Sequence, residues 1–263
     1  MTPEPIPVRS PSMLECRNCG AGAPVDEHFC PQCSRILALG RHGDYFTFLG
    51  LPRELLIHPQ DLERRFHELS RKFHPDYFYN ATSAERLASL ERSSYLNDAY
   101  RTLKNPVSRI EHLLAIEGLP SARTEEPSTG SGAGAGKVPP SLLEEVFALN
   151  EELDEIRELR EAGEESERLL ARLANARKPI DAKRDEHERQ LQELSARWDR
   201  ERAPSEAEGA HASAAEKREI LEALRERLLE RNYINNLLAT IEREASELQG
   251  RGTSREASLS PKP

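Results

Sequence analysis

The four cysteines of the chain form two C-x-x-C pairs, Cys16 with Cys19 and Cys30 with Cys33. Two such pairs can place four thiolates around one tetrahedral metal ion, and zinc is the metal that this ligand set favours. Iron in a rubredoxin-like site is the alternative metal, while disulfides or redox-active dithiols are the alternative chemistry. Because four thiolates fill the coordination shell of zinc, we expect a structural site that supplies folding energy and leaves no open position for catalysis.

The tripeptide His74-Pro75-Asp76 is a second candidate, because an imidazole and a carboxylate stand beside a proline at the end of a helical pattern. The residue before a proline avoids the α region, so the helix is expected to end at Phe73 and to leave His74 and Asp76 in a rigid loop. We interpret this as a polar recognition surface, with a plain turn as the alternative. The preceding helix is predicted by apolar residues at helical spacing, Leu62, Phe66, Leu69 and Phe73. Its opposite side carries the basic residues Arg64, Arg65, Arg71 and Lys72.

A second long helix follows the tripeptide and is expected to position it. The stretch SAERLASLERSSYLNDAYRTLK is amphipathic and is stopped by Asn105-Pro106. The short aromatic segment DYFTFLGLP could cross both helices. The expected core positions of the second helix are Leu87, Leu90, Tyr95, Ala99 and Leu103.

The composition bounds the function. Only 37% of the chain is hydrophobic, 32% is charged and the net charge is −9, which favours small domains and exposed helices over one large core. An acidic chain is a poor default for nucleic-acid binding, and no apolar run is long enough to span a membrane. We find no phosphate-cradling glycine loop and no nucleophile constellation, so we do not expect an enzyme.

The second half predicts three helices in a bundle, following a Gly-rich linker. The first of these helices has expected core positions Leu142, Val146, Leu149, Leu153 and Ile156. Beside that stripe, Leu143 and Phe147 stand next to Glu151 and Glu155, and Tyr233 is similarly placed on the last helix. A broad core face and an exposed protein-binding patch with an acidic rim are both compatible with this pattern.

Taken together, the segments DYFTFLGLP, LERRFHELSRKFHPDYF and LNDAYRTLKNPVSRIEHLL resemble the J-domain of the Hsc20/HscB family of iron–sulfur assembly co-chaperones. SLLEEVFALNEELDEI and NYINNLLATIE resemble parts of the family's carboxy-terminal domain. The resemblance implies an all-α fold, in which a J-domain helical hairpin and a carboxy-terminal three-helix bundle follow a small zinc-ribbon-like module.

The resemblance also implies two binding sites. The first would dock on an Hsp70 of the HscA or DnaK type and stimulate its ATPase through His74, Pro75 and Asp76, supported by Arg64, Arg65, Arg71 and Lys72. The second would bind an IscU-type iron–sulfur scaffold and deliver it to the Hsp70, through Leu143, Phe147, Glu151, Glu155 and Tyr233. Glu144 and Ala148 depart from the methionine and glutamate usual in the family. The alternative is a general J-protein that holds unfolded clients with its zinc module and bundle.

The expected organisation divides the chain into six segments. These are a disordered tail (1–13), a zinc module (14–40), a J-domain (41–120), a flexible linker (121–138), a helical scaffold-binding domain (139–250) and a second tail (251–263). The Pro-rich start has neither a charged n-region nor an apolar h-region, so we expect the cytoplasm, or the mitochondrial matrix in a eukaryote, and no membrane partner.

Overall fold

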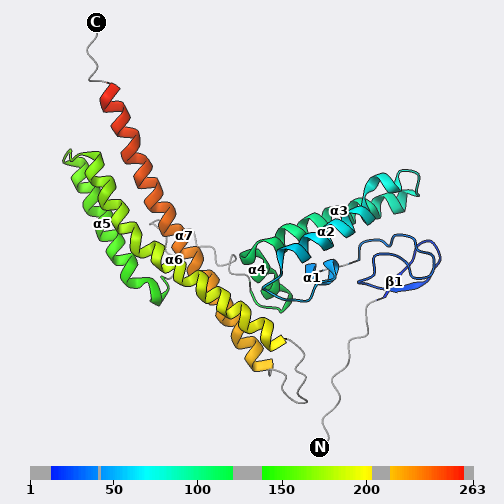
Figure 1. The fold of residues 1–263 in the computed structure, drawn as a ribbon. Coiled ribbons are helices and arrows are strands. Elements are labelled where there is room, and N and C mark those ends of the chain that lie inside the picture. Colours follow the sequence, from blue (N-terminus) through cyan, green and yellow to red (C-terminus); the bar gives the residue numbers. More distant parts are fainter. Residues whose placement is uncertain (1–12, 41–42, 121–137, 203–213, 258–263) are drawn as a thin grey trace, which may run out of the picture. The chain divides into compact units, whose positions relative to one another are not determined.

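The computed structural model describes residues 13–40, 43–120, 138–202 and 214–257 (Figure 1). The chain forms two compact units, Met1–Gly118 and Leu119–Pro263. The predicted first tail and linker lie outside the described residues, apart from Met13 and Val138. In the described part of the chain, no helix is both long and apolar enough to cross a membrane.

The first unit begins with a small module, residues 13–40, which we call the metal module. Its strands β1 (Met13–Glu15) and β2 (Gly22–Pro24) are antiparallel, with Leu14 opposite Ala23. A bridge between Phe29 and Ile36 closes the second half of the module. The strands are too short to bury a core of their own, so the module needs other sources of stability.

Helices make up the rest of this unit: α1 (Tyr45–Leu49), α2 (Pro59–Phe73), the 3₁₀ turn η1 (Pro75–Phe78), α3 (Ser83–Lys104) and α4 (Pro106–Ile116). α2 and α3 lie side by side and form a helical hairpin (Figure 1). Thr82 and Glu85 form a reciprocal capping box at the start of α3, and the Asn105 side chain caps α4. The core joins α1, α2 and α3 to Ile36 of the metal module, while Phe78 of η1 and Ile116 of α4 are partly buried against it. Its buried members are Ile36, Phe46, Phe48, Leu49, Leu62, Leu69, Phe73, Ala88, Leu96, Ala99 and Leu103.

The predicted core face of α3 is wrong at two positions. Leu87 and Leu90 are 52% and 55% exposed. The buried face lies next to them round the helix and is formed instead by Ala88, Ser89, Arg92, Leu96, Ala99 and Leu103. Its small residues let α3 approach its neighbours closely, and a periodicity count that looks only for large apolar residues overlooks such a face.

The second unit is a bundle of three helices, α5 (Leu143–Glu161), α6 (Ser166–Arg202) and α7 (Ala214–Ala257), preceded by the turn η2 (Pro140–Leu142) (Figure 1). All five predicted core residues of the first helix are buried, and Trp198 of α6 is buried as well. α7 ends at Ala257, which differs from the predicted start of the tail at residue 251. The core of the bundle comprises Leu142, Val146, Leu149, Leu153, Ile156, Leu169, Leu173, Ile180, Ile234, Leu238, Ile241 and Leu248.

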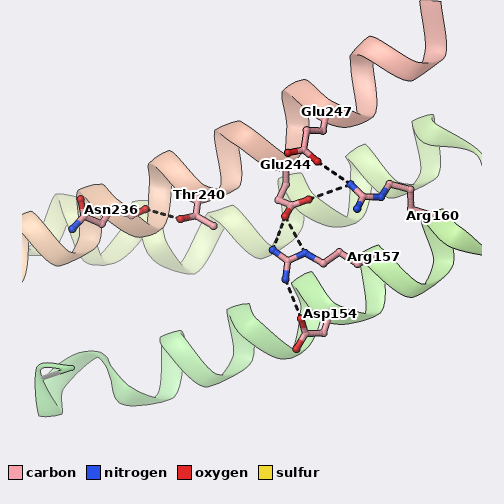
Figure 2. Close-up of polar contacts among 7 residues, drawn as sticks. All are labelled: Asp154, Arg157, Arg160, Asn236, Thr240, Glu244 and Glu247. Atoms are coloured by element: carbon pink, nitrogen blue, oxygen red, sulfur yellow. Dashed lines mark hydrogen bonds and ion pairs between the residues drawn. The ribbon is translucent and has the colours of Figure 1, made fainter. Parts of the chain in front are cut away.

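Ion pairs fix α5 against α7 (Figure 2). Buried Glu244 of α7 accepts from Arg157 at 2.6 Å and lies 3.5 Å from Arg160, while Arg160 also pairs with Glu247 at 3.1 Å. The hydrogen bonds to Glu244 raise the pKa of Arg157, so its guanidinium stays charged at neutral pH. Because Glu244 is buried, losing its arginine partners would leave its carboxylate uncompensated. These ion pairs therefore stabilise the packing of α7 on α5, the helix that carries Leu143 and Phe147.

Candidate functional site

The four cysteine sulfurs lie within 4.8 Å of one another, which is close enough to bind a metal ion. The Sγ atoms of Cys16 and Cys33 are 3.6 Å apart, as are those of Cys19 and Cys30, and all four are free thiols. A disulfide would need a separation of about 2.05 Å. In a tetrahedral zinc site with Zn–S bonds of about 2.3 Å, neighbouring sulfurs lie about 3.8 Å apart. The geometry of the predicted ligands therefore fits one tetrahedral ion.

Backbone hydrogen bonds build the two turns that carry these ligands. Gly20 N–H donates to the Cys16 carbonyl at 2.8 Å, and Ser34 N–H donates to the Cys30 carbonyl at 2.9 Å. Both donors have positive φ angles, 73° at Gly20 and 56° at Ser34. These two left-handed residues close each C-x-x-C loop, so each loop directs its two sulfurs to one side.

The tripeptide lies where α2 ends, at Phe73, and η1 begins. We call His74, Pro75 and Asp76 the corner. His74 is extended, with φ −58° and ψ 127°, as predicted for a residue before proline. Pro75 and Asp76 belong to a 3₁₀ turn instead of the expected loop. The His74 and Asp76 side chains are 52% and 85% exposed, and His74 Nδ1 lies 3.5 Å from Asp76 Oδ2. The corner therefore offers both polar groups to solvent.

The four basic residues of α2 differ in the ion pairs that they form with described residues. Arg64 pairs with Asp61 at 2.7 Å, and Arg65 pairs with Glu68 at 3.3 Å. Arg71 and Lys72 are exposed in the last turn beside the corner, and neither forms an ion pair with a residue that the structure describes. Cations at a helix carboxyl end are favoured by the helix dipole. Among the described residues, the basic charge of this face that has no ion-pair partner thus lies next to His74 and Asp76.

Leu143 and Phe147 form an exposed apolar pair one turn apart on α5, with Leu143 41% and Phe147 70% exposed. Glu151 is exposed one turn further along. Two of the other predicted residues are partly engaged elsewhere. Glu155 accepts from Arg172 of α6 at 2.5 Å, and Tyr233 packs against the bundle core, where burial raises its pKa. Leu143, Phe147, Glu151 and Glu155 are therefore exposed, and Glu155 differs from Glu151 in being held by an ion pair.

The sequence did not reveal the residues of α3 that bind the end of α2, directly before the corner. Ser89 and Ser93 of α3 both donate to the Phe73 carbonyl, at 2.6 and 3.0 Å. Arg92, between them, is fully buried and bonds to the metal module. A signal was available: Ala88, Ser89, Arg92, Leu96 and Ala99 recur at helical spacing. A buried face containing an arginine and small residues is uncommon, however, and Leu87 and Leu90 provided a more conventional stripe.

Three of the described histidines outside the corner occupy structural positions. His28 lies in a cluster of aromatic rings, and His112 Nε2 accepts from the Tyr45 backbone at 3.0 Å. His187 is buried in the bundle and is 3.3 Å from Glu230. Burial lowers the pKa of both His112 and His187. His42 and His211 lie outside the described residues.

The fold is similar to the crystal structure of the human co-chaperone protein HscB, with a TM-score of 0.54. The two sequences are 26% identical, and the match covers 88% of this chain and 98% of the human chain. The chaperone HscB from Vibrio cholerae is 24% identical, with a TM-score of 0.47, over 78% of this chain and 99% of its own. No protein-family model matches the sequence. The human structure confirms the predicted resemblance to HscB co-chaperones and the predicted all-α fold with a small cysteine module.

Proposed function

We propose that this protein is a J-domain co-chaperone of iron–sulfur cluster assembly. It stimulates the ATPase of an Hsp70 and delivers an IscU-type scaffold to it. The observation that carries the proposal is the exposed corner of His74, Pro75 and Asp76, next to the exposed cations Arg71 and Lys72. It stands on a chain that resembles human HscB over most of both lengths.

The Hsp70 site acts by binding alone and needs no catalytic group of its own. Arg71 and Lys72, with Arg64 and Arg65 behind them, provide electrostatic complementarity to an acidic surface, which governs association rate and orientation. His74 and Asp76 make the specific polar contacts. A ligand can accelerate hydrolysis by the chaperone only if it binds the hydrolysis-competent state more tightly than the other states.

The scaffold site uses the apolar pair Leu143 and Phe147 with the carboxylate of Glu151, and Glu155 and Tyr233 form its margin. An exposed apolar pair with an acidic rim suits a partner that presents an apolar patch with basic neighbours. Carrying both sites on one chain raises the effective concentration of the scaffold at the Hsp70. We place this activity in the cytoplasm, or in the mitochondrial matrix if the source is a eukaryote.

The metal bound by Cys16, Cys19, Cys30 and Cys33 is proposed to be zinc. Zinc favours four thiolates in tetrahedral geometry, and the separations between the sulfurs fit its bond length. Because four thiolates fill the coordination shell, the ion has a structural role and no open position for a substrate.

The test is the steady-state ATPase rate of an HscA-like or DnaK-like Hsp70, titrated with this protein in the presence and absence of an IscU-type scaffold. We expect stimulation by the protein alone and a greater than additive rate when the scaffold is present. A general J-protein would instead give equal synergy with any unfolded client and no binding to the folded scaffold. No stimulation under either condition would refute the proposal.

A further inference from the structure

Arg92 connects the helical hairpin to the metal module. Arg92 is a fully buried residue of α3, yet among the described residues its guanidinium donates only to atoms of the module. The carbonyl acceptors are Leu37 at 2.9 Å, Ala38 at 3.2 Å and Glu27 at 3.4 Å, and His28 Nδ1 lies 2.8 Å from Nη1. Burial lowers the pKa of Arg92 to about 10, so the group is charged at neutral pH. A buried charge of this kind depends on keeping its hydrogen-bond acceptors.

His28 links Arg92 to Phe73, the last residue of α2. A guanidinium can only donate, so His28 Nδ1 must accept, and Nε2 therefore holds the proton that is donated to the Phe48 carbonyl at 3.1 Å. The His28 ring meets Phe48 and Phe73 edge-on, with centroids 4.8 and 4.9 Å apart. Phe29 stacks on Phe73 at 6.1 Å, and the Arg92 guanidinium lies 5.8 Å from the same ring. Two rings of the module, His28 and Phe29, therefore pack on Phe73, the residue directly before the corner.

A second contact joins the module to the far side of the corner. Arg35 Nη1 donates to both carboxylate oxygens of Glu85, at 2.8 and 3.1 Å. The Glu85 carboxylate also accepts from the backbone and hydroxyl of Thr82, which caps α3. The hydrogen bond from Arg35 lowers the pKa of Glu85. The module thus touches both the last residue of α2 and the first turn of α3, and the corner lies between them.

The atoms that make these contacts are fixed by the metal ligands. Glu27, His28 and Phe29 immediately precede Cys30, while Arg35 to Ala38 follow Cys33. Hydrogen bonds from Cys30 N–H to the Arg35 carbonyl, 2.8 Å, and from Leu37 N–H to the His28 carbonyl, 3.1 Å, join the two segments. A module with so little apolar content draws its folding energy from metal ligation. Loss of the ion would release the acceptors of Arg92 and the two module rings that pack on Phe73.

We propose that the metal module is a metal-dependent support of the corner, in which Arg92 is the positioning residue, so that Hsp70 stimulation falls when the metal is lost. This inference rests on the proposed Hsp70 site. The four cysteines would then regulate Hsp70 stimulation, because a chelator or an oxidant that removes the ion would weaken a chaperone contact that lies outside the module.

The test compares the full-length zinc-loaded protein with the same protein stripped by a chelator. Amide hydrogen exchange across Asp76 to Ala81 is measured together with Hsp70 stimulation. We expect exchange at the corner to quicken by about tenfold or more on metal removal, and the concentration for half-maximal stimulation to rise. Exchange in α5, α6 and α7 is expected to stay unchanged, because those helices form a separate unit.

Arg92→Gln tests the connection itself, and Arg101→Gln on the same helix is the control, because Arg101 is exposed and bonds only to Asp98 among the described residues. Arg92→Gln is expected to reproduce the effect of metal loss on corner exchange and on Hsp70 stimulation. Removing the metal from this variant should change both quantities less than it does in the wild type, because the shared contact is already broken. If Arg92→Gln does not fold, Arg35→Gln breaks the second contact at an exposed side chain, and exchange at the corner is expected to rise by up to about fivefold.

The inference would be overturned if removing the metal changed neither the exchange at the corner nor the Hsp70 stimulation. It would also be overturned if Arg92→Gln gave the same exchange and stimulation as Arg101→Gln, or if Arg35→Gln gave wild-type exchange at the corner. Failure of the proposed function has a different signature. If zinc-loaded Asp76→Asn stimulates Hsp70 as well as wild type does, the corner is not the Hsp70 site. If Asp76→Asn is inactive while metal removal has no effect, only the support by the metal module is refuted.

Discussion

Ser89 Oγ of α3 donates a 2.6 Å hydrogen bond to the carbonyl of Phe73, the last residue of α2. The final carbonyls of a helix have no partner within it, and Pro75 has no N–H to offer. Ser93 supplies a second donor to the same oxygen at 3.0 Å. The end of α2, and with it the corner, is therefore fixed by side chains of the neighbouring helix.

Ser89→Ala is expected to lower the free energy of unfolding of the first unit by about 0.5–1.5 kcal/mol, because it removes a buried hydrogen bond while Ser93 still donates to the Phe73 carbonyl. Urea denaturation followed by circular dichroism measures the change. Ser94→Ala is the control, since Ser94 is exposed on the same helix, and its effect should stay within about 0.5 kcal/mol. Equal effects of the two substitutions would show that the bond to Phe73 contributes nothing.

Phe147→Ala is expected to abolish or greatly weaken binding of an IscU-type scaffold, because the ring is 70% exposed and forms part of the proposed apolar contact. Stability should be nearly unchanged, since little of the side chain is buried. Isothermal titration calorimetry gives the affinity. Leu90→Ala on α3 removes a similarly exposed apolar side chain and should bind the scaffold like wild type; wild-type affinity in Phe147→Ala would contradict the proposed site.

The bundle is expected to lose stability as the pH falls from about 7 to about 5, in part through His187. Burial lowers the pKa of this histidine, with Arg227 and Lys183 acting in the same direction and Glu230 opposing them. Below the unfolded-state pKa of about 6.5, the unfolded chain therefore binds a proton that the folded chain resists. The stabilisation is complete above this pKa and is lost on acidification.

Fluorescence of Trp198, the only tryptophan in the chain, reports on bundle unfolding because it is buried in α6. His187→Gln should flatten the dependence of the unfolding free energy on pH over this range. His67→Gln, at an exposed site on α2, is the control. A His187→Gln bundle with the same pH dependence as wild type would show that the histidine does not contribute to it.

The purified protein is expected to contain one zinc ion per chain, and Cys16→Ser combined with Cys33→Ser should remove it. Elemental analysis measures the content. Removing the metal should lower the melting temperature of the first unit and leave the Trp198 transition of the bundle unchanged. Iron in place of zinc would correct the identity of the metal, and full metal content in the double variant would exclude these cysteines as ligands.

Local chemistry made much of this molecule predictable from its sequence. The end of α2 at Phe73 follows from proline, the grouping of Cys16, Cys19, Cys30 and Cys33 follows from their spacing, and the bundle core follows from helical periodicity. The exposed state of Phe147 was left open, because periodicity places a residue on a helix face but does not show what covers that face.

The errors came from tertiary contacts. Leu87 and Leu90 looked like core residues, but the face of α3 that packs carries Arg92 and small residues. An arginine can be buried in a core only where hydrogen-bond acceptors surround its guanidinium. Here the acceptors are backbone carbonyls from more than fifty positions earlier in the chain, such as that of Leu37. No pattern within α3 indicates their presence.

The most direct test of the central claim is the steady-state ATPase rate of the Hsp70 titrated with Asp76→Asn, with wild type and Asp98→Asn of α3 in parallel. Circular dichroism first establishes that both variants are folded, as expected for an Asp76 side chain that is 85% exposed. We predict that Asp98→Asn stimulates like wild type and that Asp76→Asn leaves the chaperone at its basal rate. Wild-type stimulation by folded Asp76→Asn would contradict the account.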